Sequence, residues 1–230
     1  TLFLFLSKTY SLFSKISLYD NNNNLISNNN YAIKQMATLI NEGKIVAIKG
    51  LGGFHLVCDA TNEKSLKELR ARKNRPTKPF AVMFSSLDDV KLNVKLSKKE
   101  EEIVNSKEKP ITLLNKKERT DLSNEVAPNI DRLGCFIAYT PLHHLLFKYL
   151  KNPIVATSAN PSGDPILRFK EELISKLSHV IDYILDFNRD IINACDDSVV
   201  QVVNDEISVL RNARGYAPSS LKLKEKSKKK

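Results

Sequence analysis

The chain has 230 residues, of which 42% are hydrophobic and 27% charged, a composition typical of a globular protein that buries a sizeable core. Its net charge is +10, but residues 221–230 hold six lysines against one glutamate. We interpret this run as a solvated Lys-rich tail, with a nonspecific nucleic-acid arm as the alternative. Three widely spaced cysteines exclude a disulfide framework or zinc module and favour a reducing, cytoplasmic setting. The short apolar start does not resemble a signal peptide, and no run has the length of a membrane span.

The first part of the chain is predicted to hold a short strand over residues 16–19, followed by an Asn-rich stretch over 21–30. We interpret the Asn-rich stretch as a mobile loop or linker because of its low complexity. Apolar residues at helical spacing predict a helix over 31–40, which Gly43 ends. Residues 45–48 then predict a buried strand.

A glycine-rich turn at residues 50–53 leads into a second extended segment, 54–58. The glycine spacing fits neither a Rossmann fingerprint nor a P-loop, so a tight turn and a close backbone approach to a ligand both stay open. Asn62 is a suitable N-cap for the next helix, which must end by Pro76. Residues 80–84 predict a strand.

The remaining chain alternates between the two kinds of element. Residues 86–106 are polar and predict two short helices, 111–114 a strand, 142–150 a helix, 154–157 a strand and 171–177 a helix. Three further strands are expected over 183–187, 198–203 and 207–210, with Asn204–Asp205 as a hairpin turn. This order predicts one α/β domain with a twisted mixed sheet, spanning residues 31–220 between an N-terminal extension and linker (1–30) and the Lys-rich tail (221–230).

Three cations, Lys73, Arg75 and Lys78, lie within six residues directly before a predicted strand. Cations at the end of a helix satisfy free carbonyls and the helix dipole, which explains Lys73 and Arg72. That explanation does not reach Lys78, which follows Pro76. Bound to one triphosphate, the three cations would neutralise charge on the transferred group and on the leaving pyrophosphate.

Small polar side chains end the strand predicted over residues 154–157: Thr157, Ser158 and Asn160, followed by Pro161. In open α/β sheets, ligands bind at the carboxyl ends of strands. The segment is therefore a candidate for binding a phosphate ester, and a hydroxyl-and-amide turn is the alternative.

Two acidic residues precede a late strand, and two arginines follow the next one. Arg211 and Arg214 could hold phosphates or a carboxylate bidentately, or pair with surface carboxylates. Asp196 and Asp197 could help to hold Mg²⁺ with ATP, or could cap a loop.

The histidines do not form a metal pair. His143 and His144 are adjacent, so they point in different directions on a helix. One of them contacting substrate and one packed in the core both stay open, and the same holds for His55. Without a Ser-His-Asp or Cys-His set, covalent catalysis is disfavoured.

Taken together, these segments resemble the YrdC-like domain, in the version found inside HypF-type carbamoyltransferases of nickel–iron hydrogenase maturation. The segments that carry the resemblance, in the family's order, are 45–56, 73–79, 139–144, 157–163, 195–200 and 211–218. Phe54-His55 and the Thr140–His144 segment point to the HypF type rather than to the threonylcarbamoyl-adenylate synthases of the same superfamily. The resemblance covers residues 16–220.

The resemblance implies an open α/β sheet with a basic concave groove. It also implies that ATP, with Mg²⁺, and carbamate from carbamoyl phosphate are converted to carbamoyl adenylate and pyrophosphate. The carbamoyl group then passes to a HypE-like acceptor protein. This chain would be the middle of such a protein, without its acylphosphatase, zinc-finger and C-terminal transferase domains.

Roles for individual residues follow from the same resemblance. Three cations would hold phosphates, three polar residues would orient the adenylate phosphate and the carbamoyl group, and two arginines would close the groove. In that order these are Lys73, Arg75 and Lys78; Ser158, Asn160 and Ser198; and Arg211 and Arg214. Lys49 would contact the acyl end, and Thr157, His55 and His143 are further substrate-binding candidates.

Three other functions stay open. A threonylcarbamoyl-adenylate synthase for tRNA modification would require threonine and bicarbonate. A module without turnover would use the basic groove and the lysine tail to bind double-stranded RNA. A docking subunit would serve separately encoded transferase and acylphosphatase chains.

Overall fold

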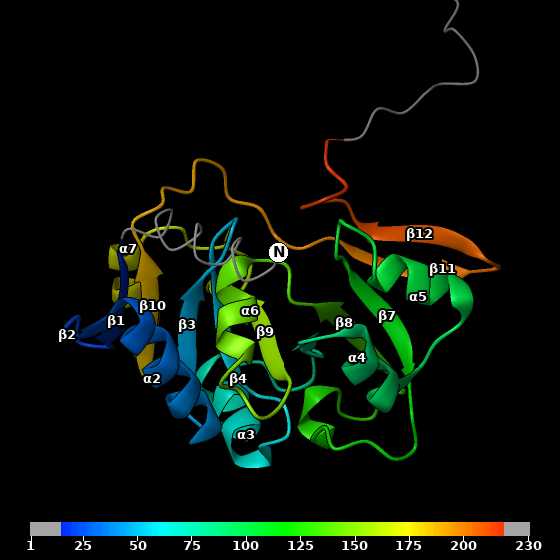
Figure 1. Ribbon diagram of the computed structural model, residues 1–230, viewed down its shortest axis with the longest axis horizontal. Helices are drawn as coiled ribbons and strands as arrows, with labels where there is room; N and C mark the ends of the chain where they lie inside the picture. Colours follow the sequence, from blue (N-terminus) through cyan, green and yellow to red (C-terminus); the bar gives the residue numbers. More distant parts are fainter. Residues whose placement is uncertain (1–14, 219–230) are drawn as a thin grey trace, which may run out of the picture.

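The computed structural model of the chain describes residues 15–218, so the apolar start and the Lys-rich tail lie outside the described residues. A single mixed sheet of 12 strands runs through the molecule in the order β12-β11-β7-β8-β5-β9-β4-β3-β10-β1-β2, with β6 paired to β7 (Figure 1). The strands are β1 (Ile16–Asp20), β2 (Leu25–Asn28), β3 (Val46–Lys49), β4 (Phe54–Asp59), β5 (Ala81–Phe84), β6 (Val94–Lys95), β7 (Ile111–Lys116), β8 (Arg132–Ile137), β9 (Ile154–Ser158), β10 (Tyr183–Phe187), β11 (Val199–Val203) and β12 (Glu206–Arg211). The expected open mixed sheet is confirmed.

Helices cover both faces of this sheet. They are α2 (Asn29–Asn41), α3 (Glu63–Arg72), α4 (Leu87–Asn93), α5 (Lys98–Val104), α6 (Pro141–Phe147) and α7 (Lys170–Leu177), with a short 3₁₀ turn η1 (Asn124–Val126). Side chains alternate between the two faces of the sheet along β3. Ala47 packs into the core under α3, α4, α5 and α7, whereas Val46 and Ile48 pack into the core under α2 and α6. None of these helices is long and apolar enough to cross a membrane.

Several predicted signals act as expected. Gly43, which follows the C-cap residue of α2, has φ +86°, and the Asn62 side chain accepts a hydrogen bond from the Ser65 amide at 3.1 Å to cap α3. Asn204 and Asp205 both have positive φ between β11 and β12, as a tight hairpin turn requires.

The prediction of an irregular Asn-rich loop is wrong for residues 25–30. Residues 25–28 form β2, which pairs with β1, and Asn29 begins α2. The asparagines make the hairpin turn instead: the Asp20 carboxylate accepts from the amides of Asn22 and Asn24 at 2.9 and 2.8 Å, and Asn23 has φ +68°.

Strand β8 was not predicted, although it lies in the middle of the sheet. Its residues are hydrogen-bonded to β7 on one side and β5 on the other, and all but Arg132 are buried. A strand buried on both faces shows no alternation of apolar and polar residues, so only its short apolar run could have indicated it.

Two glycines of the turn between β3 and β4 lie close to other parts of the chain. A Cβ on Gly52 would lie 2.0 Å from the Cys195 carbonyl oxygen, and one on Gly53 would lie 2.5 Å from Ile166. The Cys195 amide donates to the Gly52 carbonyl at 3.1 Å. Gly52 therefore packs against the segment before Asp196, and Gly53 packs against Ile166.

Candidate functional site

A groove of about 540 Å³ lies across the strands in the middle of the sheet, with lining residues from β4, β5, β7, β8, β9 and β11. Its floor contains three small residues in one row, because Ala81 of β5 is in register with Gly134 of β8 and with Ala156 of β9. Small side chains there leave room for a ligand to lie against the sheet.

The groove is basic because the cationic segment, residues 73–80 between α3 and β5, lines it with Arg75 and Lys78. The Arg75 guanidinium lies 5.0 Å from the centre of the Phe80 ring and donates to the carbonyls of Lys78 (3.2 Å) and Pro79 (2.5 Å). Burial, together with the charges of Arg70 and Arg211, lowers the pKa of Arg75 to about 10, so it stays a cation at neutral pH.

Lys73 lies behind the lining residues. Its ammonium donates to the carbonyls of Ser158 and Asn160 at 2.9 and 2.8 Å. Burial first, and then the charges of Arg75 and Lys78, lower the pKa of Lys73 to about 8. Lys73 thus connects the cationic segment to the hydroxyl-and-amide segment at the end of β9.

The predicted polar segment lines the same groove with Thr157, Ser158 and Asn160. The Ser158 hydroxyl donates to the Asn160 side-chain oxygen at 2.8 Å, and the Asn160 amide donates to the Asp164 carbonyl. These bonds fix the orientation of the amide beside the hydroxyl.

His55 also lines the groove, next to that segment, because it is in register with Ser158. Its Nε2 lies 3.5 Å from an oxygen of Asp197, and its buried Nδ1 has no hydrogen-bond partner among residues 15–218. The other Asp197 oxygen accepts from Arg214 at 2.6 Å. Burial raises the pKa of Asp197, but His55 and Arg214 outweigh burial and hold it below its ordinary value.

Arg211 and Asp196 complete the lining at a more exposed position, with Arg211 Nη1 3.8 Å from an Asp196 oxygen. Asp197 is buried and bonded to Arg214 at 2.6 Å, whereas Asp196 is partly exposed and its contact with Arg211 is longer, so Asp196 is the lining carboxylate more accessible to a cation. Within the described part of the chain, no cluster of three His, Cys, Asp or Glu side chains could hold a metal alone. Mg²⁺ typically binds one or two carboxylates together with substrate phosphates, which fits this arrangement.

Arg214 and Ser198, expected to close the groove and to orient the substrate, are not among the residues that line it. Arg214 is bound to Asp197, donates to two backbone carbonyls of residues 108–109 at 2.9 and 3.0 Å, and lies 3.6 Å from the Tyr139 ring centre. Ser198 is fully buried and its hydroxyl accepts from the Ala213 amide at 2.8 Å. Both residues fasten the segment after β12 to the sheet.

Lys49 and His143 lie outside the lining as well. The Lys49 ammonium is 3.0 Å from Asp186 and donates to the Phe187 carbonyl at 3.0 Å, so its charge is already paired. His143 packs edge-on against Tyr139, with ring centres 5.0 Å apart, and burial lowers its pKa to about 3. It is a neutral core residue at physiological pH.

Two residues that shape the groove belong to no predicted site. Gly134 forms part of the floor, and a Cβ there would lie 2.9 Å from Ile111. Arg70 is 6% exposed and holds the backbone of the cationic segment. Its position one turn after Leu66, on the buried face of α3, was the available signal, because a cation among buried apolar positions needs partners.

Comparison with known proteins assigns the chain to a family. Residues 38–213 match the Sua5–YciO–YrdC family model, which is described as "Telomere recombination". Carbamoyltransferase HypF of Synechocystis is 41% identical over 216 residues, and probable carbamoyltransferase HypF of Methanocaldococcus jannaschii is 39% identical over 200. These alignments cover 94% and 86% of this chain but only 28% and 26% of the relatives.

Solved structures show the same relationship to HypF proteins and to the wider family. Full-length HypF in its phosphate- and nucleotide-bound form is 41% identical with a TM-score of 0.83, covering 88% of this chain and 26% of that one. Sua5 of P. abyssi, complexed with L-threonine, covers 82% of this chain and 56% of that one; at 22% identity and a TM-score of 0.71, it shares the fold. The chain therefore belongs to the Sua5–YciO–YrdC family and corresponds to about a quarter of the HypF carbamoyltransferases that it resembles.

Proposed function

We propose that this chain catalyses the ATP-dependent formation of carbamoyl adenylate, with release of pyrophosphate, from carbamate derived from carbamoyl phosphate. The observation that carries the proposal is the groove, which Arg75 and Lys78 line together with Ser158 and Asn160 over a floor of small residues. The relatives are named HypF carbamoyltransferases, and one of them was solved in a phosphate- and nucleotide-bound form, which supports this choice of reaction.

In the proposed reaction, an oxygen of carbamate attacks the α-phosphorus of ATP and forms an O–P bond. The bond from the α-phosphorus to the bridging oxygen breaks, and pyrophosphate leaves with that oxygen and its electron pair. Arg75 and Lys78 bind the phosphates and stabilise the charge that develops on the leaving group. Lys73 adds a third positive charge and holds the carbonyls of Ser158 and Asn160 in place.

The carbamoyl end of the substrate is assigned to the part of the groove formed by β4 and β9. Ser158 and Asn160 orient the α-phosphate and the carbamoyl group, with Thr157 and His55 beside them. Holding both reactants in one groove supplies the positioning on which such a reaction depends. Arg211 is left to contact phosphate from the exposed side.

The divalent cation enters with ATP in this proposal. Mg²⁺ would be held by phosphate oxygens and Asp196, and would supply further neutralisation of phosphate charge. Transfer of the carbamoyl group to a HypE-like acceptor protein is assigned to the remaining parts of HypF-type proteins, since this chain spans about a quarter of those relatives.

ATP–pyrophosphate exchange on the purified chain with Mg²⁺ tests the proposal. One arm contains carbamoyl phosphate and an acylphosphatase, and the other contains threonine and bicarbonate. Exchange with the carbamoyl source alone is the expected result. Exchange with threonine and bicarbonate alone would assign the chain to tRNA modification. A folded chain with no exchange in either arm, or one that only binds double-stranded RNA, would refute the proposal.

A further inference from the structure

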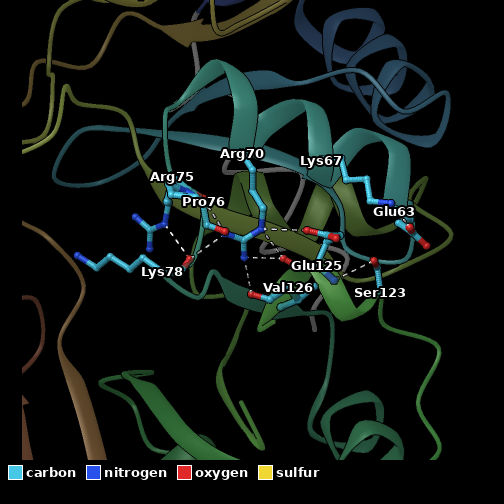
Figure 2. A network of polar contacts seen from close by, with 9 residues as sticks. All are labelled: Glu63, Lys67, Arg70, Arg75, Pro76, Lys78, Ser123, Glu125 and Val126. Carbon is cyan, nitrogen blue, oxygen red and sulfur yellow. Dashed lines mark hydrogen bonds and ion pairs between the residues drawn. The ribbon is translucent and has the colours of Figure 1, made fainter. Parts of the chain in front are cut away.

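The backbone of the cationic segment bends around one buried side chain, that of Arg70 (Figure 2). Arg70 Nη1 donates to the carbonyls of Arg75, Pro76 and Lys78 at 2.8, 3.3 and 3.2 Å. Figure 2 shows these carbonyls turned toward Arg70 while the side chains of Arg75 and Lys78 extend away from it. A single guanidinium nitrogen thus contacts three of the four residues 75–78.

The rest of the guanidinium is fixed to the η1 turn. Arg70 Nε and Nη2 donate to the Glu125 carbonyl at 2.9 and 2.6 Å, and Nη2 also reaches the Val126 carbonyl at 3.4 Å. The Glu125 carboxylate lies 3.3 Å from Nε and balances the charge. Arg70 therefore joins the cationic segment to a turn more than 45 residues further along the chain.

The cationic segment lacks a regular backbone pattern of its own. Pro76 and Pro79 have no amide hydrogen to donate, and Asn74 has φ +49°. Backbone hydrogen bonds hold its two ends, from the Arg75 amide to the Arg70 carbonyl and from the Phe80 amide to the Val126 carbonyl, each at 2.9 Å. Between these ends, the backbone carbonyls accept from side chains: those of Arg75 and Pro76 from Arg70, that of Lys78 from both Arg70 and Arg75, and that of Pro79 from Arg75.

We infer that Arg70 is a positioning residue, whose guanidinium sets the shape of the cationic segment and so directs Arg75 and Lys78 into the groove. The inference rests on the proposed function only in assigning phosphate as the ligand of those two cations. A lysine cannot replace Arg70, because a single ammonium carries three donors at one point, whereas the planar fork reaches carbonyls on two sides.

Amide hydrogen exchange by NMR, without ligand, tests the positioning itself. The variant Arg70→Lys keeps the charge and loses the fork. Arg72→Lys is the matched control, because Arg72 lies on the same helix and bonds to Asp182 and the Val180 carbonyl instead of the cationic segment. The amides of Arg75 and Phe80 are expected to exchange at least tenfold faster in Arg70→Lys and unchanged in Arg72→Lys. Unchanged exchange in a folded Arg70→Lys protein would overturn the inference.

Nucleotide affinity tests the consequence. Arg70→Lys is expected to raise the Kd for ATP about tenfold, equivalent to about 1.4 kcal/mol. In an Arg75→Ala, Lys78→Ala background the same change should add less than twofold, because Arg70 acts through those two residues. An equal loss in both backgrounds would overturn the inference. Wild-type protein that binds no ATP would instead refute the proposed function, and the exchange experiment would still decide the role of Arg70.

One measurement needs no variant and applies even if Arg70→Lys does not fold. The guanidinium N–H signals of Arg70 should stay in place when ATP is added to the wild-type protein, while those of Arg75 shift. Arg70 signals that shift or exchange rapidly on ATP binding would show that it contacts the nucleotide or releases the segment, and would overturn a positioning role.

Discussion

Removing the Arg75 guanidinium should abolish adenylate formation without unfolding the chain. Hydrogen bonds to charged groups contribute about 1.5–3 kcal/mol each. Two of the guanidinium nitrogens of Arg75, Nε and Nη2, bond to backbone carbonyls, so Nη1 is the nitrogen available to a phosphate. Loss of one such contact corresponds to a Kd for ATP about 10- to 100-fold higher in Arg75→Ala.

Arg168→Ala is a closely matched control for this variant. Like Arg75, Arg168 donates to two backbone carbonyls, those of Ile191 and Ile192, and lies about 5 Å from an aromatic ring, that of Phe169. It does not line the groove. Both variants should therefore lose a similar stability, about 1–3 kcal/mol.

Isothermal titration calorimetry with ATP and Mg²⁺, together with urea unfolding, separates the two effects. Weaker ATP binding in Arg75→Ala and unchanged binding in Arg168→Ala is the expected pair of results. If Arg75→Ala binds ATP as tightly as the wild type, or if Arg168→Ala loses as much affinity, the assignment of Arg75 to the phosphates is wrong.

Three further substitutions test Lys73, Asp197 and Gly52. Because the pKa of Lys73 is lowered to about 8, the unfolded chain binds more protons between pH 8 and the ordinary lysine value near 10.5. The unfolding free energy of the wild type, measured by urea unfolding, should therefore include a contribution that rises with pH across this window, and Lys73→Met should lack it. The affinity of the wild type for ATP should fall over the same window. Asp197→Asn should lower the unfolding free energy by about 3 kcal/mol, because it leaves the Arg214 charge unpaired. The wild type should lose this stability as the pH falls below about 4, and the variant should show no such loss. An unchanged urea midpoint in the variant would contradict the pairing of Asp197 with Arg214. Gly52→Ala should prevent the close packing of the turn before β4 against the Cys195 carbonyl, seen as a large drop in melting temperature by circular dichroism, and an unaltered melting temperature would contradict that packing.

Local sequence patterns predicted the parts of the groove that depend on neighbouring residues. Arg75 and Lys78 directly precede β5, and Ser158 and Asn160 end β9, so the pairing of β5 with β9 brings them to one groove. Capping by Asn62 and the hairpin turn before β12 are equally local. Such features need only a helix period, a strand and a stop signal to be recognised.

Contacts that the sequence does not reveal decide where several other cations lie. Lys49 is paired with Asp186, 137 positions further along the chain, and this pairing takes its charge away from the groove. Arg214 has the residue type and spacing of a phosphate ligand, but Asp197 and the carbonyls of residues 108–109 hold it in place. Arg70 lies in an ordinary helical pattern, and only the fold shows that it faces the cationic segment. The role of a buried cation depends on the residues that it contacts, and the sequence alone does not show which residues those are.

Direct detection of carbamoyl adenylate tests the proposed reaction and the role of Arg75 together. Wild-type chain, Arg75→Ala and Arg168→Ala would each be mixed with ATP, Mg²⁺, carbamoyl phosphate and an acylphosphatase, quenched within a single turnover and analysed by mass spectrometry. We expect carbamoyl adenylate, with equimolar pyrophosphate, from the wild type and Arg168→Ala, and none from Arg75→Ala. Carbamoyl adenylate from Arg75→Ala at the wild-type level, or none from a folded wild-type chain, would contradict the proposal.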